Sequence, residues 1–382
     1  MPVVLDARVV SDRFPGIGRY VANLARGLVK VAPDLDLALI VGGDDPPSLE
    51  LPAVPRVRCT ASPFSPRQQW EVPAALRRLR ADLYHSGFYL MPYWPDAPVV
   101  FTCHDLIPLL YPRYFTRTQR VVYEQTHRLA AARARVILAI SQSTKNDLVR
   151  LLGVPAERVH VILLAADPNF RPQPAERLAQ VRARLGLPER FLLYVGSNKP
   201  HKNLVRLVEA YARMRRRGRA AECELVIAGP WDAAYPEPQQ AVEREGIGDH
   251  VRFLGPIPEA DLPAVYGAAA AFAFPSEYEG FGSPVAEAMA CGTPVVCGRT
   301  SSLIELTADA AVLVDPLDVD ALSAALERVA ADADLRAALR QRGLARAAEL
   351  SWERVAAETL ACYGQVAPHV RGCAPPADKE RG

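Results

Sequence analysis

Short apolar runs alternate with longer amphipathic stretches along most of the chain. In the first half, stretches with a helical period cover residues 18–31, 117–134 and 142–152. Strands separated by helices of about ten to fifteen residues are typical of βαβ units, which build a parallel sheet. The pattern therefore predicts strands at residues 3–6, 37–41, 81–86, 98–105, 134–141 and 158–165.

The second half of the chain repeats this alternation. Its apolar runs are FLLYVGS, CELVIAG, VRFLG, AAFAFPS, PVVCG and AVLVD, and each is followed by a helical stretch or by a turn rich in glycine and proline. The chain is therefore predicted to be an α/β protein with two doubly wound domains. In such folds a ligand binds where the carboxyl ends of strands and the N-termini of helices converge, so we expect it in a cleft between the domains.

Changes in composition predict the domain boundaries. The first domain is predicted over 1–167 and the second over 191–350, because residues 168–190 hold four prolines, a short basic helix and no strand, as in a linker. A C-terminal helix is expected over 351–367, with Ser351 as its N-cap, and its crossing back to the first domain is left open. Residues 368–382 have no periodicity and are expected to form a flexible tail.

Overall composition excludes some classes of protein. Half of the 382 residues are hydrophobic and 23% are charged, which excludes wholesale disorder. The net charge of +2 does not argue for a nucleic-acid partner, and none is expected. Among the 45 basic residues only five are lysine, a bias typical of a GC-rich, bacterial genome.

Cysteine spacing and the N-terminus predict the compartment. The number of cysteines is odd and no pair has CxxC spacing, so they are expected to be buried thiols in a reducing compartment. The N-terminus lacks the pattern of a signal peptide, and the longest apolar run falls short of the roughly 18 residues of a membrane span. The protein is expected to be cytoplasmic and at most peripheral to a membrane. The cysteines are Cys59, Cys103, Cys223, Cys291, Cys297, Cys362 and Cys373.

The segment 275–296, PSEYEGFGSPVAEAMACGTPVV, is the strongest candidate for chemistry. After a strand that closes at 272–275, it predicts a loop with Glu279 and then a helix with Ser283 as N-cap, Pro284 at the first position and Glu287 in the first turn. An ordinary strand–loop–helix turn is the simpler alternative. Amides at a helix N-terminus bind phosphates, and glycines let a ligand approach the backbone closely. The residues expected to do this are Gly280, Phe281, Gly282 and Ser283.

This segment resembles the E-x7-E signature of retaining glycosyltransferases of the GT-B fold, in glycosyltransferase family 4. The resemblance covers nearly the whole chain. It includes PGIGRYVANL near the N-terminus, and FTCHDLIPLLYPRYF and AISQSTKNDLVRLLGVPAERVHVI in the first half. The second half adds LLYVGSNKPHKNL, LVIAGP and VRFLGPIPEADLPAVYGAA. The resemblance implies two Rossmann-like domains with an interdomain cleft, an acceptor-side first domain and a second domain that binds a nucleotide-sugar.

The resemblance also implies roles for residues of the second half. Glu279 would hold a hydroxyl of the donor sugar, Glu287 the ribose hydroxyls, and Lys202 the donor diphosphate. An ammonium aimed at the leaving diphosphate would stabilise the transition state. The family often has an arginine where this chain has Ser197. Two neighbours, Lys199 and His201, are the candidates to replace its charge.

Residues of the first half are assigned to the acceptor side and to the donor phosphates. His104 closes a strand in FTCHD, where the family has a histidine that touches the transferred sugar. Asp105 either orients the imidazole or caps the next turn. Gly16 and Gly18 are expected in a loop that lets the acceptor and the donor phosphates approach closely. They only half-match a dinucleotide fingerprint, so nicotinamide binding is not expected.

Three charged patterns in the sequence have more than one interpretation. Three DxD triplets occur at residues 34–36, 318–320 and 332–334, where aspartate caps helices or turns, so no metal is required. The run RMRRRGR, 213–219, is expected to be a solvated helix end. Residues 1–170 hold 20 basic and 15 acidic residues, and Arg77, Arg78 and Arg80 cluster on one helix. A peripheral membrane contact of the first domain is therefore one option, suited to a lipid-linked acceptor.

The sequence thus predicts a retaining glycosyltransferase, in which a sugar passes from a nucleotide-sugar donor to a glycan or lipid-linked acceptor without a further cofactor. The family implies front-face substitution, in which the leaving diphosphate helps to deprotonate the acceptor. Branch resemblance favours mannose from GDP-mannose for cell-surface polysaccharide or glycoconjugate synthesis. A UDP-sugar transferase acting on a small molecule, a sugar-nucleotide epimerase and a silent binding protein are the alternatives.

Overall fold

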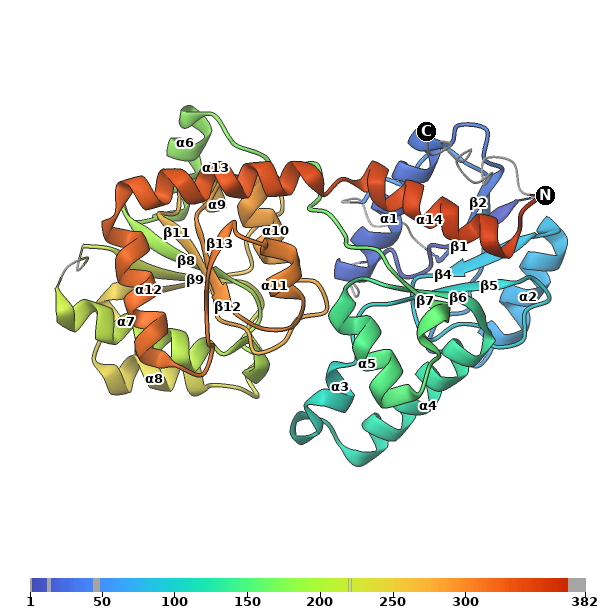
Figure 1. The fold of residues 1–382 in the computed structure, drawn as a ribbon, viewed down its shortest axis with the longest axis horizontal. Helices are drawn as coiled ribbons and strands as arrows, with labels where there is room; N and C mark the ends of the chain where they lie inside the picture. The colour runs from blue at the N-terminus through green and yellow to red at the C-terminus, as the bar shows by residue number, and fades with distance from the viewer. Residues whose placement is uncertain (1, 12–14, 44–48, 219, 221, 370–382) are drawn as a thin grey trace, which may run out of the picture. The chain divides into compact units, whose positions relative to one another are not determined.

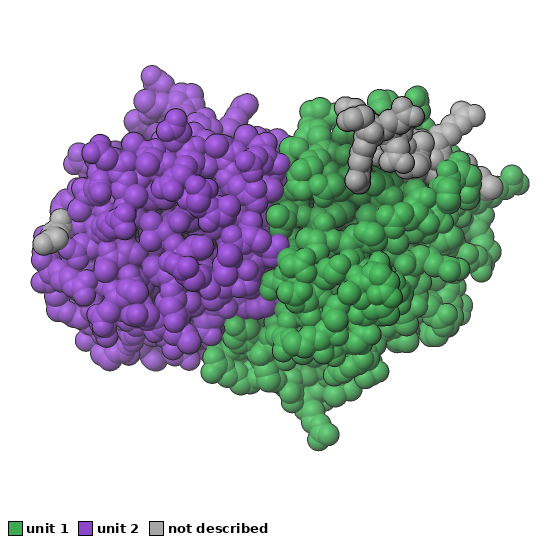
Figure 2. Space-filling model, in the orientation of Figure 1, with its two compact units in different colours: residues 1–164, 351–382 green, residues 165–350 purple. Residues whose placement is uncertain are grey.

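The structure is a computed structural model that describes residues 2–11, 15–43, 49–218, 220 and 222–369. It divides into two compact units, coloured green and purple in Figure 2. Unit 1 comprises residues 1–164 and 351–382, and unit 2 comprises residues 165–350. Most of the predicted tail, residues 370–382 including Cys373, lies outside the described residues.

Unit 1 is built on a seven-stranded sheet with the order β3-β2-β1-β4-β5-β6-β7, in which every pairing is parallel. The six predicted strands are confirmed. The seventh strand, β3, was missed because it is a three-residue edge strand of sequence RVR with no apolar run. The strands are β1 (Val3–Asp6), β2 (Leu37–Val41), β3 (Arg56–Arg58), β4 (Leu83–Ser86), β5 (Val99–Cys103), β6 (Ala134–Ala139) and β7 (Val159–Val161).

Helices cover both faces of this sheet (Figure 1). On one face, apolar side chains of α2, α4 and α5 join a single core cluster with strand residues such as Tyr84 and Phe101. On the other face α1 packs against α14, and Tyr363 of α14 is hydrogen-bonded to His85 of β4. The helices of this unit are α1 (Pro15–Val31), α2 (Gln68–Leu79), α3 (Ile107–Leu110), α4 (Arg117–Arg133), α5 (Gln142–Leu152) and α14 (Trp352–Val366).

Unit 2 has a six-stranded parallel sheet with the order β10-β9-β8-β11-β12-β13. All six strands agree with the predicted runs. The strands are β8 (Phe191–Val195), β9 (Glu224–Ala228), β10 (Val251–Gly255), β11 (Ala271–Phe274), β12 (Val295–Gly298) and β13 (Ala311–Val314). The helices are α6 (Ala175–Leu185), α7 (Leu204–Arg217), α8 (Glu237–Glu245), α9 (Leu262–Ala268), α10 (Ser283–Ala290), α11 (Ser301–Thr307), α12 (Val319–Ala331) and α13 (Ala333–Glu349).

The segment predicted as a linker, 168–190, lies within unit 2 in the structure. Its helix α6 packs against α9, and Arg177 and Arg184 both form ion pairs with Asp261, at 2.7 and 2.5 Å. The prolines that suggested a linker flank this packed helix. At the other boundary Ser351 caps α14 as predicted, accepting a hydrogen bond from the amide of Arg354, and α14 belongs to unit 1.

Two further expectations concern membranes and cysteines. In the described part of the chain, no helix is both long and apolar enough to cross a membrane. The six described cysteines are all buried and unbonded to one another, as predicted for small apolar side chains.

The strand order reverses between β1 and β4 in unit 1 and between β8 and β11 in unit 2. Loops at the carboxyl ends of strands diverge at such a switch point and leave room for a ligand. The candidate residues of unit 2 follow β8 and β11, on both sides of its switch point.

Candidate active site

Lys202 is positioned by a short turn that is fastened to the end of β11. A 3-10 turn, Pro200–Lys202, follows β8 and ends at Asn203, whose φ of +61° lies in the left-handed region. The buried side-chain amide of Asn203 donates, through Nδ2, hydrogen bonds to the carbonyl oxygens of Pro275 (3.0 Å) and Pro316 (2.6 Å). Lys202 is thereby brought to the segment that carries Glu279.

Glu279 is held on both sides of its backbone by serines at the start of α11. Its amide donates to Oγ of Ser301 at 2.9 Å, and Oγ of Ser302 donates to its carbonyl at 3.0 Å. Its carboxylate is buried and accepts from Nζ of Lys202 at 2.7 Å on each oxygen. Both serines were missed because they bind the backbone of a residue more than 20 positions away, which no local pattern indicates.

The start of α10 corrects the prediction that Ser283 is the N-cap. Gly282 is the N-cap and Ser283 is the first helical residue, exposed and without a capping hydrogen bond. Gly282 has φ = +96°, and a Cβ there would lie 2.5 Å from Cδ2 of Leu303, so a side chain is excluded. The first helical hydrogen bond is donated by Val285, after the amides at 281–283. Those amides therefore sit at a helix N-terminus, as anion binding requires.

Glu287 is the fifth residue of α10, so it lies in the second turn and not in the first as predicted. Its side chain is buried, and the hydroxyl of Tyr266 on α9 donates to Oε2 at 3.0 Å. Gly280 and Phe281 are also buried in the loop that joins Glu279 to this helix. The two glutamates thus have different partners: an ammonium for Glu279 and a phenol for Glu287.

Lys199 and His201, the two candidates to replace the charge of the family's arginine, differ in their charge at neutral pH. Burial, together with the charges of Lys202 and Lys199, lowers the pKa of His201 to about 3. His201 is therefore neutral at neutral pH and brings no positive charge. Lys199 is exposed on the same turn and remains the candidate. Ser197 is half-buried, and its carbonyl accepts from the Tyr194 hydroxyl at 2.7 Å.

In unit 1, His104 directly follows β5 and is partly buried. Its Nε2 lies 3.0 Å from the carbonyl oxygen of Gly87. Because a carbonyl only accepts, Nε2 carries the proton and Nδ1 keeps its lone pair. Burial lowers the pKa of His104 to about 4, so the imidazole is neutral near pH 7. The ring of Tyr20 packs edge-on against it, with the centroids 5.0 Å apart.

Asp105 caps the next turn, which was one of its two predicted roles. Its Oδ1 accepts from the amide of Ile107 at 3.0 Å. The other predicted role was to orient the His104 imidazole, but the hydrogen bond from His104 Nε2 described above goes to the carbonyl oxygen of Gly87.

Gly16 and Gly18 lie inside the first turn of α1, not in a loop before it as predicted. Gly16 is exposed, and a Cβ there would meet no atom within 4 Å. Gly18 is buried, and a Cβ would lie 3.1 Å from the carbonyl oxygen of Val9. Gly18 thus allows close packing of α1 on the chain after β1, whereas Gly16 borders solvent.

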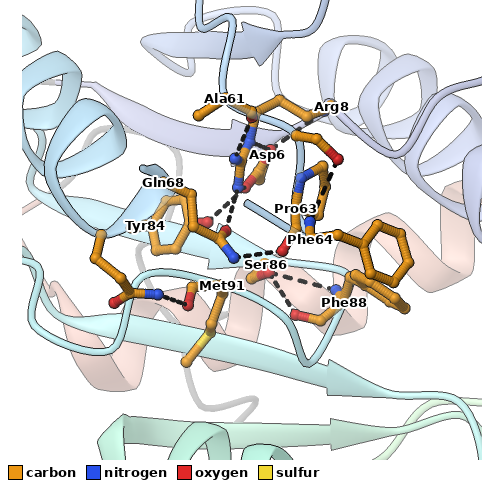
Figure 3. A network of polar contacts seen from close by, with 12 residues as sticks. Asp6, Arg8, Ala61, Pro63, Phe64, Gln68, Tyr84, Ser86, Phe88 and Met91 are labelled. Carbon is orange, nitrogen blue, oxygen red and sulfur yellow. Dashed lines mark hydrogen bonds and ion pairs between the residues drawn. The ribbon is translucent and has the colours of Figure 1, made fainter. Parts of the chain in front are cut away.

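A buried ion pair at the carboxyl end of β1 was missed (Figure 3). Arg8 and Asp6 meet at 2.6 Å, and the Tyr84 hydroxyl donates to Asp6 at 2.5 Å. Arg8 also donates to the carbonyl of Ala61 and to Oε1 of Gln68, which ties the start of α2 to the sheet. Burial by itself would raise the pKa of Asp6, but Arg8 and Tyr84 hold this pKa below its usual value. Two charged residues that interrupt the apolar run VVLDARVV were the available signal.

Asp318 and Asp332, two of the DxD aspartates, cap helices as predicted. Their carboxylates accept from the amides of Ala321 and Leu335 and begin α12 and α13. Among the described residues, no group of three histidine, cysteine, aspartate or glutamate side chains is placed to hold a metal ion.

Residues 213–217 of the basic run form the end of α7, as expected for a helix end, and residue 219 lies outside the described residues. Its arginines are met by acidic groups, among them Asp320 at 2.7 Å from Arg213 and Glu245 at 3.0 Å from Arg216. This agrees with the interpretation of the run as a solvated helix end.

Two family patterns match the chain, one in each half. The family described as "Glycosyltransferase Family 4" matches residues 15–170, and "Glycosyl transferases group 1" matches residues 179–346. The boundary between the two matches falls close to the boundary between units 1 and 2.

Similar proteins carry related names. The chain is 34% identical over 298 residues to O-antigen chain mannosyltransferase B of Escherichia coli, covering 78% of this chain and 77% of that protein. It is 30% identical over 393 residues to D-inositol 3-phosphate glycosyltransferase of Salinispora arenicola, covering 92% and 87%.

Solved structures share the fold at lower sequence identity. The sucrose-phosphate synthase of Thermosynechococcus elongatus superposes with a TM-score of 0.77 at 24% identity, over 96% of this chain and 99% of that one. Anabaena Alr3699/HepE, crystallised with UDP-glucose, superposes with a TM-score of 0.73 at 20% identity, over 95% and 100%.

Proposed function

The chain belongs to glycosyltransferase family 4, with the GT-B fold, and from this premise we propose that it transfers mannose from GDP-mannose with retention of configuration. As an enzyme it is a glycosyltransferase of polysaccharide or glycoconjugate synthesis. The proposed acceptor is a hydroxyl of a glycan or of a lipid-linked sugar.

The Lys202–Glu279 pair beside the N-terminus of α10 carries the proposal. An ammonium and a row of helix-start amides are the groups that stabilise the negative charge of a departing nucleoside diphosphate. Glu279, held through its backbone, would accept a hydroxyl of the donor sugar once the diphosphate engages Lys202. Glu287, in the second turn of α10, would accept the ribose hydroxyls.

The proposed chemistry is a front-face substitution without a covalent intermediate. Both carboxylate oxygens of Glu279 already accept from Lys202, which suits a positioning role better than that of a nucleophile. The bond from the anomeric carbon to the diphosphate oxygen breaks, and the acceptor oxygen forms the new bond on the same face. The leaving oxygen takes the acceptor proton, so the site needs no metal and no further cofactor.

His104 is proposed to contact the transferred sugar from unit 1. Its Nε2–H is engaged by Gly87, so Nδ1 is the atom left to accept a sugar hydroxyl. With a pKa lowered to about 4, the ring serves as a neutral acceptor and not as an acid. Asp105 sets the turn that follows, and the first turn of α1, with Gly16 and Gly18, is proposed to approach the donor phosphates.

Mannose is favoured by one relative and a small-molecule acceptor by another. The Escherichia coli relative is named a mannosyltransferase, whereas the Salinispora relative is named for inositol 3-phosphate. The alternative is therefore a UDP-sugar transferase acting on a small molecule, in line with the UDP-glucose complex of the Anabaena protein. The proposed location is the cytoplasm, with a peripheral contact to the inner face of the membrane.

A panel of nucleotide-sugars tests the proposal. GDP-mannose, UDP-glucose, UDP-N-acetylglucosamine and GDP-fucose would be incubated with the enzyme, with and without mannosylated glycans or inositol 3-phosphate, and free nucleotide and product would be measured. We expect GDP release that depends on a glycan acceptor, and an α-linked product by NMR. Nucleotide release without any acceptor would favour an epimerase. Turnover of UDP-sugars but not of GDP-mannose would contradict the proposed donor. A β-linked product would contradict the retaining chemistry.

A further inference from the structure

A chain of hydrogen bonds runs through the interior of unit 1, from α14 to α1. The hydroxyl of Tyr363 lies 2.6 Å from Nδ1 of His85, and Nε2 of His85 lies 2.8 Å from Oγ1 of Thr102. The same Oγ1 lies 2.8 Å from the hydroxyl of Tyr20. The four side chains come from α14, β4, β5 and α1, and each is no more than 3% exposed. The proposed function gives none of them a role.

The donors and acceptors of this chain follow one order. Among the described residues the Tyr20 hydroxyl has one hydrogen-bond partner, Oγ1 of Thr102, so the buried phenol satisfies its proton by donating it there. Thr102 then donates its single hydroxyl proton to Nε2 of His85. Because Nε2 accepts, the proton of the neutral ring is on Nδ1 and is donated to the oxygen of Tyr363. Burial lowers the pKa of His85 to about 3, which keeps this ring neutral near pH 7.

Tyr20 lies between this chain and the His104 imidazole. Its ring packs edge-on against that of His104, with the centroids 5.0 Å apart and the planes at 85°. It also borders Gly87, whose carbonyl accepts from Nε2 of His104. A Cβ on Gly87 would lie 3.4 Å from Cε1 of Tyr20. Tyr20 therefore contacts both the ring of His104 and the segment that supplies its hydrogen-bond acceptor.

Tyr20 is held at both of its ends. Its backbone belongs to α1, which packs against α14 (Figure 1), and its hydroxyl is bound to Thr102 on β5. The ring of Trp352, on α14, packs against it with the centroids 6.1 Å apart. Burying four polar groups is costly unless every donor meets an acceptor, and an apolar side chain would fill the same space without that requirement. The chain therefore adds a fixed ring orientation, which packing alone does not require.

We propose that Tyr20 is a positioning residue for the transfer reaction, which holds the His104 imidazole in the orientation that leaves Nδ1 to accept a hydroxyl of the transferred sugar. The single hydrogen bond to Gly87 does not by itself fix the plane of the ring. The edge of the phenol does so, and Thr102 and His85 keep the phenol in place. This inference rests on the proposed function, because it concerns the contact between His104 and the sugar.

A double-mutant cycle tests whether Tyr20 acts through His104. Tyr20→Leu, His104→Ala and the double variant would be assayed by steady-state kinetics. We expect Tyr20→Leu to lower kcat by roughly three- to tenfold, the effect of one hydrogen bond, and to change the Kd of GDP by less than about twofold. His104→Ala should lower kcat at least as much, and the double variant should lose no more than His104→Ala. Losses that multiply in the double variant would mean that Tyr20 acts on another group, and would overturn the proposal.

Conservative variants separate the ring from its anchor. Tyr20→Phe keeps the edge-on contact and removes only the hydroxyl, so it should lose less activity than Tyr20→Leu. Thr102→Val removes the link between Tyr20 and His85 at nearly constant volume and should lower kcat, whereas Thr102→Ser keeps the hydroxyl and should retain it. Equal kcat values in the two Thr102 variants would show that the hydrogen-bonded chain does not hold the phenol, and would contradict the proposed anchor.

Tyr211, on α7 in unit 2, provides the control for loss of a buried tyrosine. Its side chain is 0% exposed, and its hydroxyl donates to the carbonyl oxygens of Cys223 (2.9 Å) and His250 (3.1 Å). Tyr211→Leu should lower the thermal unfolding temperature, as Tyr20→Leu does, but leave kcat of the folded enzyme near the wild-type value. An equal loss of kcat in both variants would mean that activity only follows stability, and would overturn the proposal.

Nitrogen-15 NMR of protein with labelled histidines reads the state of each ring without any substrate. The chain has seven histidines, and the variants His85→Gln and His104→Ala assign two of their signals. In the wild type we expect the proton on Nδ1 in His85 and on Nε2 in His104, each as a single tautomer. Tyr20→Leu should turn His104 into a mixture of tautomers, whereas Tyr211→Leu should leave it unchanged. A single Nε2–H tautomer of His104 that persists in Tyr20→Leu would overturn the proposal.

The two kinds of readout separate failure of this inference from failure of the proposed function. If His104→Ala transfers sugar normally while the tautomer of His104 still depends on Tyr20, the positioning of the ring is supported and its contact with the sugar is rejected. If His104→Ala lowers kcat and Tyr20→Leu does not, the proposed role of His104 stands and the positioning role of Tyr20 is overturned.

Discussion

The ammonium of Lys202 lies 2.7 Å from each carboxylate oxygen of Glu279, and this pair joins the turn after β8 to the loop after β11. The two side chains are 18% and 8% exposed, so each is the main counter-charge of the other. If Lys202 binds the donor diphosphate as proposed, the diphosphate has to compete with Glu279 for its ammonium. The proposed function thus implies that donor binding is coupled to this ion pair.

Lys202→Ala should reduce kcat about a hundredfold or more, since an electrostatic donor aimed at developing charge is worth roughly 3–4 kcal/mol. An interaction that strengthens as the glycosidic bond breaks appears in kcat and not only in KM. Lys202→Arg should restore part of the loss, because a planar guanidinium places its charge differently. Steady-state kinetics with a working donor and acceptor measure all three enzymes.

A double variant separates catalysis from folding at the same position. Lys202→Ala alone leaves the buried Glu279 carboxylate without its partner and should lower the thermal unfolding temperature. Adding Glu279→Gln removes that charge and should recover stability, but it should not recover kcat. Recovery of both would mean that Lys202 acts only through the fold.

Glu287→Ala should weaken nucleoside diphosphate binding by about ten- to hundredfold, since a charge-assisted hydrogen bond contributes roughly 1.5–3 kcal/mol. Tyr266→Phe, which removes only the phenol that donates to Glu287, is the control and should change affinity much less. Isothermal titration calorimetry with GDP and UDP measures both variants. Equal losses of nucleotide affinity in the two variants would mean that Glu287 only holds α9 against α10 and does not bind the nucleotide.

Lys199 should carry the charge that the arginine of the family supplies elsewhere. Lys199→Ala is expected to weaken diphosphate binding, whereas His201→Gln should not, because the pKa of His201 is lowered to about 3 and its ring is neutral. Ser197→Arg combined with Lys199→Ala should restore affinity. Titrations with GDP near pH 7.5 test this, and a strong loss in His201→Gln would contradict it.

Arg8→Ala should destabilise unit 1 by about 3–5 kcal/mol, because it leaves the Asp6 carboxylate buried without a counter-charge. Arg77→Ala removes an arginine from an exposed ion pair with Asp96 and should cost less than about 1 kcal/mol. Urea unfolding measures the two free energies. Hydrogen exchange should also rise in residues 61–68, which Arg8 ties to the sheet, and unchanged exchange there would argue that the network does not hold the start of α2.

The sequence by itself determined the alternation of elements, because apolar periodicity is a local property. Runs such as VVLD and AFAF form buried strands. Ser351, Asp318 and Asp332 cap helices through contacts only three residues away. The family signature, too, is a matter of spacing, and it led directly to Glu279 and Glu287. The short strand Arg56–Arg58 was missed because its pairing with β2, and not its own composition, makes it a strand.

Only the tertiary structure decided the partners of the site residues, because these contacts join segments far apart in the chain. It paired Lys202 with Glu279 across 77 positions and Glu287 with Tyr266 across 21. It also decided charge states, since burial keeps His201 neutral. The cap of α10 is Gly282 and not Ser283, at a position where Leu303 leaves no room for a Cβ. Local pattern fixes which element a residue joins, whereas burial and long-range contacts decide what its side chain can do.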